Sequence, residues 1–378
     1  MAWKIPLFKT HWQQDNIDAV NRVISRGSYW ATGPEIEEFE QELAKFNNQK
    51  YALTFNSGTS ALHAMYLAVD VKGKEVICPS FTFVATANAI VAAGGIPIFA
   101  ESEEETFGLD AEDVKKRITP NTKAIIALHY AGGVSRDIEK LQQLAKEHNL
   151  ILLEDNAHSL GVKKNNQLCG TFGKAAALSF CQNKLITTGE GGAIITNSKE
   201  IYEKMKLIRS HGRVESIAGD YFSHTGDNDY VEVGFNFRMP TMCAALGLSQ
   251  LKHFQETMNL RITAGNYLNE HLKKIKELTA PEPHHNSDHF YQMYTIKLQD
   301  QATRDALQKH LEQKSIMSKV YYNPVHLKTF YRKNYNYKAG SLPKTEAIAN
   351  KILTLPIYPG MPQAECDEII NSIKEFFL

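Results

Sequence analysis

The sequence predicts a two-domain α/β protein, with a large doubly wound domain at residues 1–252 and a smaller α+β domain at residues 253–378. From Tyr51 to about Thr196, short β-branched runs alternate with helical patterns, which is typical of a mostly parallel sheet flanked by helices. Beyond Pro240 the pattern changes to long helical repeats. The chain has 378 residues, and this length accommodates two domains.

The predicted elements of the large domain follow in order. Two helical stretches, at residues 14–25 and 35–46, precede the sheet. The expected strands are apolar runs at residues 51–55, 75–78, 96–99, 124–128, 151–154 and 193–196. Helices between them are expected to begin after Ser57, Asp110 and Asp137, whose side chains are good N-caps. A ligand of such a sheet binds at the carboxyl ends of its strands.

The second domain is predicted from fewer signals. Apolar residues repeat at helical spacing from Met242 to Leu272 and indicate long helices that join the two domains. One clear strand follows at residues 292–298, and helices are expected near residues 302–313, 345–352 and 365–376.

Composition and charge exclude several classes of protein. There are 42 basic and 42 acidic residues, so no global field attracts nucleic acid or an anionic membrane surface. No apolar run approaches the ~20 residues that a spanning helix needs, and the first residues lack the apolar core of a signal peptide. We therefore expect a protein without membrane or nucleic-acid partners, in which local contacts hold any phosphorylated ligand.

Five cysteines are scattered without a Cys-x-x-Cys pair, which favours free thiols in a reducing cytoplasm over a disulfide framework or a metal site. Cys181 lies near Lys184 and invites an interpretation as a nucleophile. A buried cysteine that packs as a small hydrophobic residue is the favoured alternative.

The first candidate site is Asn56-Ser-Gly-Thr-Ser60, between a strand and a helix. A strand that turns through glycine into a helix points free N–H groups and hydroxyls at one place, which suits a phosphate. Ser57, Gly58 and Thr59 are the candidate ligands, although an ordinary N-cap explains the same pattern.

Aromatic residues follow the next strand, in the segment 79–86. Phe83 can stack on a planar cofactor at the same edge of the sheet as Ser57. The alternative is that Phe81 and Phe83 both fill the core, the commoner place of a phenylalanine.

Asp155 ends a buried strand, where a carboxylate needs a cationic partner. A protonated pyridine nitrogen is such a partner, and a nearby lysine or arginine, or a helix N-terminus, is the alternative. His158, three residues further on, either reaches a cofactor hydroxyl or caps its helix.

Lys184 closes the run Ser179-Phe-Cys-Gln-Asn-Lys184 and leads into Gly189-Glu-Gly-Gly192. A lysine that attacks an aldehyde must be partly neutral, which burial promotes. Ser179 offers a hydroxyl to a phosphate. An acid, a sheltered lysine and glycines together are what an enzyme needs to hold pyridoxal 5′-phosphate as a Schiff base.

These motifs resemble the DegT/DnrJ/EryC1/StrS family of pyridoxal phosphate-dependent nucleotide-sugar aminotransferases. The resemblance covers nearly the whole chain, with matches in the same order and at similar spacing. The matching segments are residues 25–34, 56–62, 79–83, 154–155, 179–180 with Lys184, 190–192, 211–212, 234–239, 342–346 and 355–359. It implies the type I, or aspartate aminotransferase, fold with a seven-stranded, mostly parallel sheet.

The resemblance also implies roles for the candidate residues. Lys184 would bond to the cofactor and move protons as the acid/base, and Asp155 would bind the pyridine nitrogen. Phe83 would stack on the ring, while Gly58, Thr59 and Ser179 would hold the phosphate. Asn236 of a neighbouring subunit would reach the same phosphate, so the active site would be shared within a homodimer. Many relatives have glutamine at the position of His158 and others have histidine, and the resemblance implies a role for this side chain near the cofactor hydroxyl.

The activity implied is transfer of an amino group from glutamate to a keto group of a nucleotide-linked keto-deoxy sugar, in amino-sugar and glycan (lipopolysaccharide O-antigen) biosynthesis. Amination at C4 is favoured, and amination at C3 is the alternative. A sugar-dehydrating branch of the family has histidine in place of the lysine, so retention of Lys184 disfavours that activity. Arg238 and His326 are candidates for the donor carboxylate or the nucleotide diphosphate, and a structural role is the alternative for each.

Two rival classes fit the sequence less well. A nicotinamide oxidoreductase requires Gly-x-Gly-x-x-Gly after its first strand, and the segment at Gly58 lacks this series. A non-catalytic regulator that retains the fold would tolerate loss of Lys184 or Asp155, and both are present.

Overall fold

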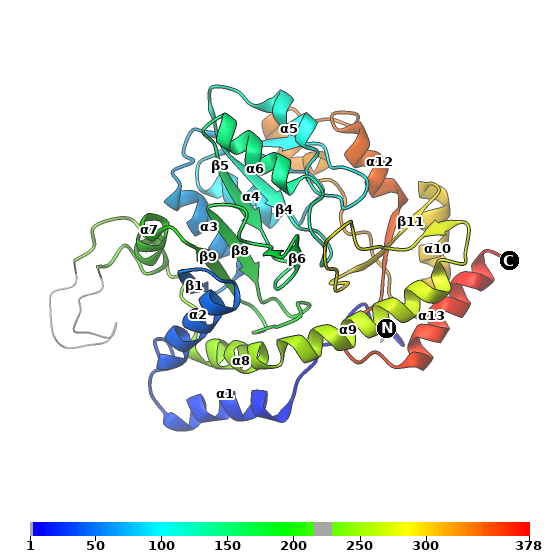
Figure 1. Ribbon diagram of the computed structural model, residues 1–378, viewed down its shortest axis with the longest axis horizontal. Coiled ribbons are helices and arrows are strands. Elements are labelled where there is room, and N and C mark those ends of the chain that lie inside the picture. The colour runs from blue at the N-terminus through cyan, green and yellow to red at the C-terminus, as the bar shows by residue number, and fades with distance from the viewer. Residues whose placement is uncertain (1–2, 215–228) are drawn as a thin grey trace.

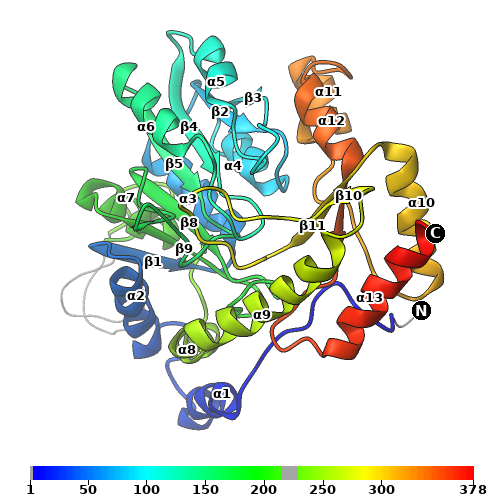
Figure 2. The ribbon, with the colours of Figure 1, turned by 45° about the vertical axis from the view of Figure 1, so that its right-hand side comes forward.

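The computed structural model describes residues 3–214 and 229–378 and contains two domains side by side (Figure 1). Most of the blue segment and the cyan and green segments form the large α/β domain, and the yellow to red segments form most of the small one (Figure 1). Helices α8 (Thr241–Lys252) and α9 (Phe254–Leu272) run in succession from the first domain into the second. Both chain ends lie on the small-domain side (Figure 2).

The large domain is built on a seven-stranded sheet in the order β1-β9-β8-β5-β4-β2-β3. Strand β9 runs antiparallel to both of its neighbours, and the other strands are parallel to one another. The strands are β1 (Tyr51–Phe55), β2 (Glu75–Pro79), β3 (Ile96–Ala100), β4 (Thr122–Leu128), β5 (Ile151–Asp155), β8 (Ala175–Ser179) and β9 (Gly192–Thr196). The parallel strands therefore end at one common edge.

Both faces of this sheet are buried, because apolar side chains alternate between two cores along each strand. In β4, Ile125 belongs to one core and Ile126 to the other. Of the helices of the large domain, those that contribute to the first core are α2 (Pro34–Phe46), α5 (Ala111–Arg117), α6 (Ile138–Glu147) and α8, and those that contribute to the second are α3 (Gly58–Ala68), α4 (Ala85–Ala92) and α7 (Lys199–Arg209). Helix α1 (Gln14–Arg26) packs on α8.

The small domain has its own antiparallel sheet and core. The sheet comprises β10 (Leu278–Thr279), β11 (Tyr294–Leu298) and β12 (Ile352–Leu355), covered by α10 (Gln301–Gln313) and α13 (Gln363–Phe376). The remaining elements are the hairpin β6 (Lys163–Lys164) and β7 (Gln167–Leu168), the short helix η1 (Val325–Leu327), α11 (Thr329–Tyr335) and α12 (Pro343–Lys351). Ile5 packs in this second core, so the first segment of the chain joins the small domain rather than the large one.

Each strand expected from the sequence is present, with small differences at the ends. Helix α12 ends at Lys351 because Ile352 begins β12, and β11 begins at Tyr294 rather than at Gln292. Strand β8 was not among the expected runs, because its alanines lack the β-branched side chains that mark strands. Among the residues the structure describes, no helix is long and apolar enough to cross a membrane.

Candidate active site

A cavity of about 470 Å³ lies at the carboxyl edge of the large sheet. The ends of β1, β5 and β8 and the segment after β2 each contribute polar or aromatic groups to it, as expected for a parallel sheet. Eight of the residues predicted from the sequence line this one cavity: Ser57, Gly58, Thr59, Phe83, Asp155, His158, Ser179 and Lys184.

The first turn of α3 provides a place for an anion. The hydroxyl of Ser57 caps the helix by accepting a hydrogen bond from the Ser60 N–H at 3.0 Å. No acidic side chain lies in this first turn, and the unpaired N–H groups there carry partial positive charge. Ser57 is thus an ordinary N-cap and also part of the cavity wall.

Two glycines allow β1, β8 and β9 to converge beside this turn. A Cβ on Gly192 would lie 2.6 Å from the Gly58 nitrogen, and one on Gly58 would lie 3.2 Å from the Ser179 Cβ. Gly192 pairs with Ser179 across β8 and β9. Only glycine fits at Gly192, and the result is that the Ser179 hydroxyl and the α3 N-terminus face the same space.

Asp155 faces the cavity, and its neighbour Glu154 does not, because successive side chains of a strand point to opposite faces. Glu154 is buried on the other face, where its carboxylate accepts hydrogen bonds from Gly170 and Gly173 and lies 2.8 Å from His129 Nε2. Glu154 is therefore structural, whereas the side chain of Asp155 lines the cavity.

The Asp155 carboxylate is held in place by two hydrogen bonds. Thr86 Oγ1 donates to Oδ2 at 2.7 Å, and the Ala157 N–H donates to Oδ1 at 3.2 Å. Burial raises the pKa of Asp155. The two hydrogen bonds, together with Lys184 and His129, lower this pKa but only partly offset the effect of burial. A cation placed beside the carboxylate would stabilise its charged form and so compensate for its desolvation.

His158 presents an unsatisfied nitrogen. Its Nε2 lies 3.2 Å from the Tyr322 hydroxyl, and the two rings are stacked with an interplanar angle of 12°. Its Nδ1 is buried without a hydrogen-bond partner in the described part of the chain. Burial and the nearby Lys184 keep the pKa of His158 well below its usual range, so the imidazole is neutral. A buried nitrogen of this kind is expected to bind a ligand group or an ordered water.

Lys184 lies in the loop between β8 and β9, next to the buried side chains of Leu185 and Ile186. Burial lowers the pKa of Lys184 to about 8, and Arg261 acts in the same direction, while Asp155 and Cys181 oppose them. A substantial fraction of the amine is therefore neutral near physiological pH, as a nucleophilic lysine requires.

Arg261 of α9 is a buried cation that supports this loop indirectly, through Gln292. It is 2% exposed, and its guanidinium donates to the carbonyls of Tyr291 and Gln292, each at 2.7 Å. No described carboxylate pairs with it. The Gln292 side chain in turn donates to the Asn183 carbonyl at 2.6 Å, one peptide before Lys184. The small domain thus contributes both charge and support to the lysine.

Phe83 and Phe81 have different environments, and only one of the two fills the core. Phe81 is fully buried, whereas Phe83 is 56% exposed and lines the cavity. An aromatic side chain exposed inside a cavity offers its face to a planar ligand.

Three other predicted residues lie outside the cavity. His326 is fully buried, with Nδ1 2.7 Å from the Ser80 hydroxyl and Nε2 3.0 Å from Glu346. Both nitrogens are therefore occupied, which gives His326 a structural role and corrects the expectation of a substrate contact. Arg238 donates to the Ser210 hydroxyl at 3.0 Å. Asn236 is exposed, and its carbonyl accepts a hydrogen bond from Asn56.

Sequence reasoning missed Thr86, Tyr322, Gln292 and Arg261. Thr86 lies in the segment after β2, but nothing in the sequence indicates its contact with Asp155. The other three come from the second domain, and their only signal is polarity within an otherwise apolar stretch. Among the residues that the structure describes, no cluster of His, Cys, Asp and Glu is arranged to hold a metal ion.

The fold and the site together define an enzyme with the type I fold of pyridoxal phosphate-dependent transferases. A seven-stranded sheet carries a helix N-terminus, a buried acid and a lysine of lowered pKa at one edge. The chain belongs to the DegT/DnrJ/EryC1/StrS aminotransferase family, whose model matches residues 11–374.

Known proteins similar to this chain match it almost from end to end. The GDP-perosamine synthase of Vibrio cholerae is 33% identical over 376 residues, covering 99% of each chain. Among solved structures, Helicobacter pylori PseC, an aminotransferase involved in the biosynthesis of pseudoaminic acid, has 30% identity and a TM-score of 0.92 over 99% of each chain. S. venezuelae DesV, solved with a ketimine intermediate, has 29% identity and a TM-score of 0.88 over 98% of each chain.

Proposed function

We propose that this protein is a pyridoxal 5′-phosphate-dependent aminotransferase that moves an amino group from glutamate to the C4 keto group of a nucleotide-linked keto-deoxy sugar. The observation that carries the proposal is the convergence of Lys184, Asp155 and the α3 N-terminus in one cavity. The similarity to GDP-perosamine synthase and to PseC supports a sugar substrate. The resemblance of the site segments to those of C4 aminotransferases favours that carbon.

The residues present fit this cofactor. The α3 N-terminus, Thr59 and Ser179 suit its phosphate, and the exposed face of Phe83 suits its ring. Asp155 suits the protonated ring nitrogen, and the unsatisfied Nδ1 of His158 is available to the ring hydroxyl. When bound, pyridoxal phosphate supplies an electron sink for charge that develops at the carbon losing its proton.

The chain's own groups account for the remaining chemistry. Lys184 Nζ would move a proton between the donor Cα and the cofactor C4′, in one direction with glutamate and in the other with the sugar. Asp155 would keep the ring nitrogen protonated, because a buried carboxylate stabilises the adjacent positive charge. Thr86 holds that carboxylate in place. Gln292 holds the carbonyl that precedes Lys184.

An amination assay tests the proposed reaction. The purified enzyme is incubated with glutamate and a panel of nucleotide-linked 4-keto and 3-keto sugars, and NMR locates the new C–N bond. We expect a 4-amino sugar as the product. Aspartate and glutamine are tested in place of glutamate to identify the amino donor. A 3-amino product would show that the enzyme aminates C3 rather than C4, and a deoxygenated product would show the dehydrating activity. No amination of any keto sugar would contradict the proposal.

The lowered pKa of Lys184 predicts how cofactor uptake depends on pH. With a pKa of about 8 in place of 10.5, the neutral amine at pH 7 is roughly 300-fold more abundant. The rate at which apoenzyme binds pyridoxal phosphate covalently should rise with pH and level off above about pH 8. Stopped-flow absorbance measures it. A rate that keeps rising to pH 10 would show that burial does not lower the pKa of this lysine. In Arg261→Leu the plateau should begin at higher pH, because Arg261 contributes to the lowered pKa of Lys184.

Ser179→Ala is expected to weaken cofactor binding. Loss of one hydrogen bond to a charged phosphate corresponds to about a 10- to 100-fold increase in Kd. Equilibrium titration of apoenzyme with pyridoxal phosphate measures this. The matched control is Ser198→Ala, which removes the N-cap of α7 and should lower stability by about 1 kcal/mol without changing the Kd. If the two variants bind pyridoxal phosphate with equal affinity, Ser179 does not bind the phosphate.

We also propose a homodimer with shared active sites. Support comes from large apolar side chains that are exposed along α1 and the segments beside it: Trp12, Ile17, Ile24, Tyr29 and Trp30. Exposed apolar surface of this extent is typical of an interface. Asn236, exposed in the single chain, would then bind the phosphate of the other subunit.

Mixing two inactive variants tests this arrangement. Lys184→Ala and Asn236→Ala are each expected to have low activity alone. Refolding them together should restore activity, because a hybrid dimer has one site with both native residues if Asn236 comes from the partner. Activity that never exceeds the mean of the two separate variants would place Asn236 in its own subunit's site.

All five cysteines are free thiols. We propose a reducing compartment, the cytoplasm, as the place where the enzyme works, which the thiols support.

A further inference from the structure

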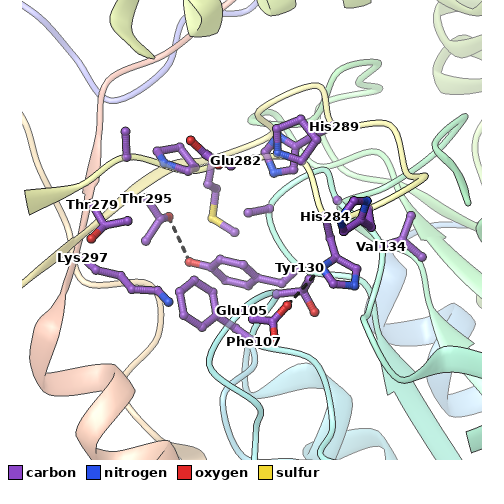
Figure 3. A pocket seen from close by; sticks show the side chains of 18 residues that line it. Glu105, Phe107, Tyr130, Val134, Thr279, Glu282, His284, His289, Thr295 and Lys297 are labelled. Atoms are coloured by element: carbon purple, nitrogen blue, oxygen red, sulfur yellow. Dashed lines mark hydrogen bonds and ion pairs between the residues drawn. The ribbon is translucent and has the colours of Figure 1, made fainter. Parts of the chain in front are cut away.

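A second cavity, of about 440 Å³, lies between the two domains and shares no lining residue with the Lys184 cavity. Figure 3 shows its walls. The large domain contributes the segments that follow β3 and β4, and the small domain contributes β11 and the chain between β10 and β11. Its volume is within the range of small-molecule sites, which often lie between domains.

Apolar surface lies at the centre of this cavity. The rings of Phe107 and Tyr130 meet edge to face with their centroids 5.3 Å apart, and Met293 belongs to the same apolar cluster. Tyr130 is fixed because its hydroxyl donates to the Tyr321 carbonyl and lies 3.1 Å from Thr295 Oγ1. A rigid aromatic surface of this kind suits a flat ring or another apolar group.

The carboxylates of the cavity already have cationic partners. Glu105 binds Arg136 at 3.1 Å, and Glu282 binds Lys273 at 2.7 Å. The other carboxylate oxygen of Glu105 lies 3.1 Å from His284 Nδ1. Neither carboxylate therefore needs a bound cation to balance its charge.

Lys297 of β11 has no comparable partner. Its ammonium donates to the Glu104 carbonyl and lies 5.2 Å from the centroid of the Phe107 ring, and no carboxylate of the described residues lies within ion-pair distance. Burial lowers the pKa of Lys297, although the more distant Glu103, Glu104 and Glu105 oppose this shift. Two N–H groups of the ammonium remain for a ligand.

His289 offers a second donor, on the opposite side of the cavity from Lys297 (Figure 3). Its Nδ1 accepts a hydrogen bond from the Tyr291 N–H at 3.1 Å, and burial lowers its pKa to about 4. The ring is therefore neutral with its proton on Nε2. The cavity thus combines a cation at one end, an N–H donor at the other and aromatic surface between them.

We propose that this inter-domain cavity binds a small aromatic anion, with its carboxylate or phosphate on Lys297 and its ring against Phe107 and Tyr130. His289 would bind a polar group at the far end of the ligand. This site is independent of the proposed transamination, because its lining contains none of the residues assigned to that reaction.

Calorimetric titration of the cofactor-loaded enzyme tests the charge requirement. Benzoate and phenyl phosphate are the two anionic probes, and benzamide is the neutral control of similar shape. At least one anion should bind about tenfold or more tightly than benzamide, and the tighter of the two identifies the acid group. Equal affinities for all three would overturn the proposal.

Matched variants test the location. Lys297→Met retains the apolar stem and should weaken binding of the preferred anion about tenfold or more. Lys309→Met, at an exposed lysine of α10, should leave it unchanged. An unaltered affinity in Lys297→Met would overturn the assignment. If that variant fails to fold, crystals of the native enzyme soaked with 4-bromobenzoate replace it. Anomalous signal beside Lys297 supports the site, and signal found only elsewhere overturns it.

Discussion

Replacing Lys184 by alanine should abolish the yellow colour of the holoenzyme and lower kcat by about 10³-fold or more, because the variant loses both the covalent link to the cofactor and the group that moves the proton. The cofactor should still bind through its phosphate, since Ser179 and the α3 N-terminus do not depend on the lysine. Absorbance spectra and single-turnover kinetics measure the two effects separately.

Two comparisons make this result specific to the amine. Lys319→Ala removes another lysine of the same cavity and should retain the visible band. Adding methylamine to Lys184→Ala should recover part of the activity, because a small free amine can occupy the vacated space and transfer the proton. A yellow, active Lys184→Ala enzyme would refute the role of this residue.

Asp155→Ala is expected to have the second largest effect. Without the carboxylate the ring nitrogen loses its proton, and the transition state loses an electrostatic interaction of a kind that contributes about 10²- to 10³-fold to kcat. Cofactor affinity should change much less, because the phosphate contacts remain. Steady-state kinetics and cofactor titration distinguish these quantities.

The cofactor itself provides the control for Asp155. N-methylpyridoxal phosphate has a permanently charged ring nitrogen, so it should restore much of the activity of Asp155→Ala while giving no gain with the native enzyme. Asp288→Asn, at an exposed position, should behave as native. Unchanged turnover in Asp155→Ala would mean that the carboxylate faces some other group.

The position of the active site could be predicted from the sequence because it depends on strand direction. Asp155 ends the expected strand β5, and Ser57 follows the end of the expected strand β1. Strand β8, which ends at Ser179, has no such signal in the sequence. Parallel strands bring such ends together whatever the details of packing. The resemblance to the aminotransferase family implies the roles that are proposed for these residues.

What could not be predicted depends on partners far apart in the chain. The sequence shows a histidine at position 326 but not that Ser80 and Glu346 occupy its two nitrogens. Tyr322 reaches His158 across the domain boundary, and Arg261 supports the lysine loop through Gln292. Such contacts are set by how the domains pack, which periodicity within one segment does not encode.

The antiparallel course of β9 has a consequence for how such enzymes diverge. Residues 180–191 leave the sheet at Ser179 and return to it at Gly192, and these two residues face each other in the β8–β9 pairing. The segment that bears Lys184 is therefore a closed insertion, and changing the length of a closed loop costs little free energy. With the roles proposed above, mutation can alter or replace the amine of Lys184 while the proposed phosphate site persists, so a lineage can acquire new chemistry without first losing its cofactor.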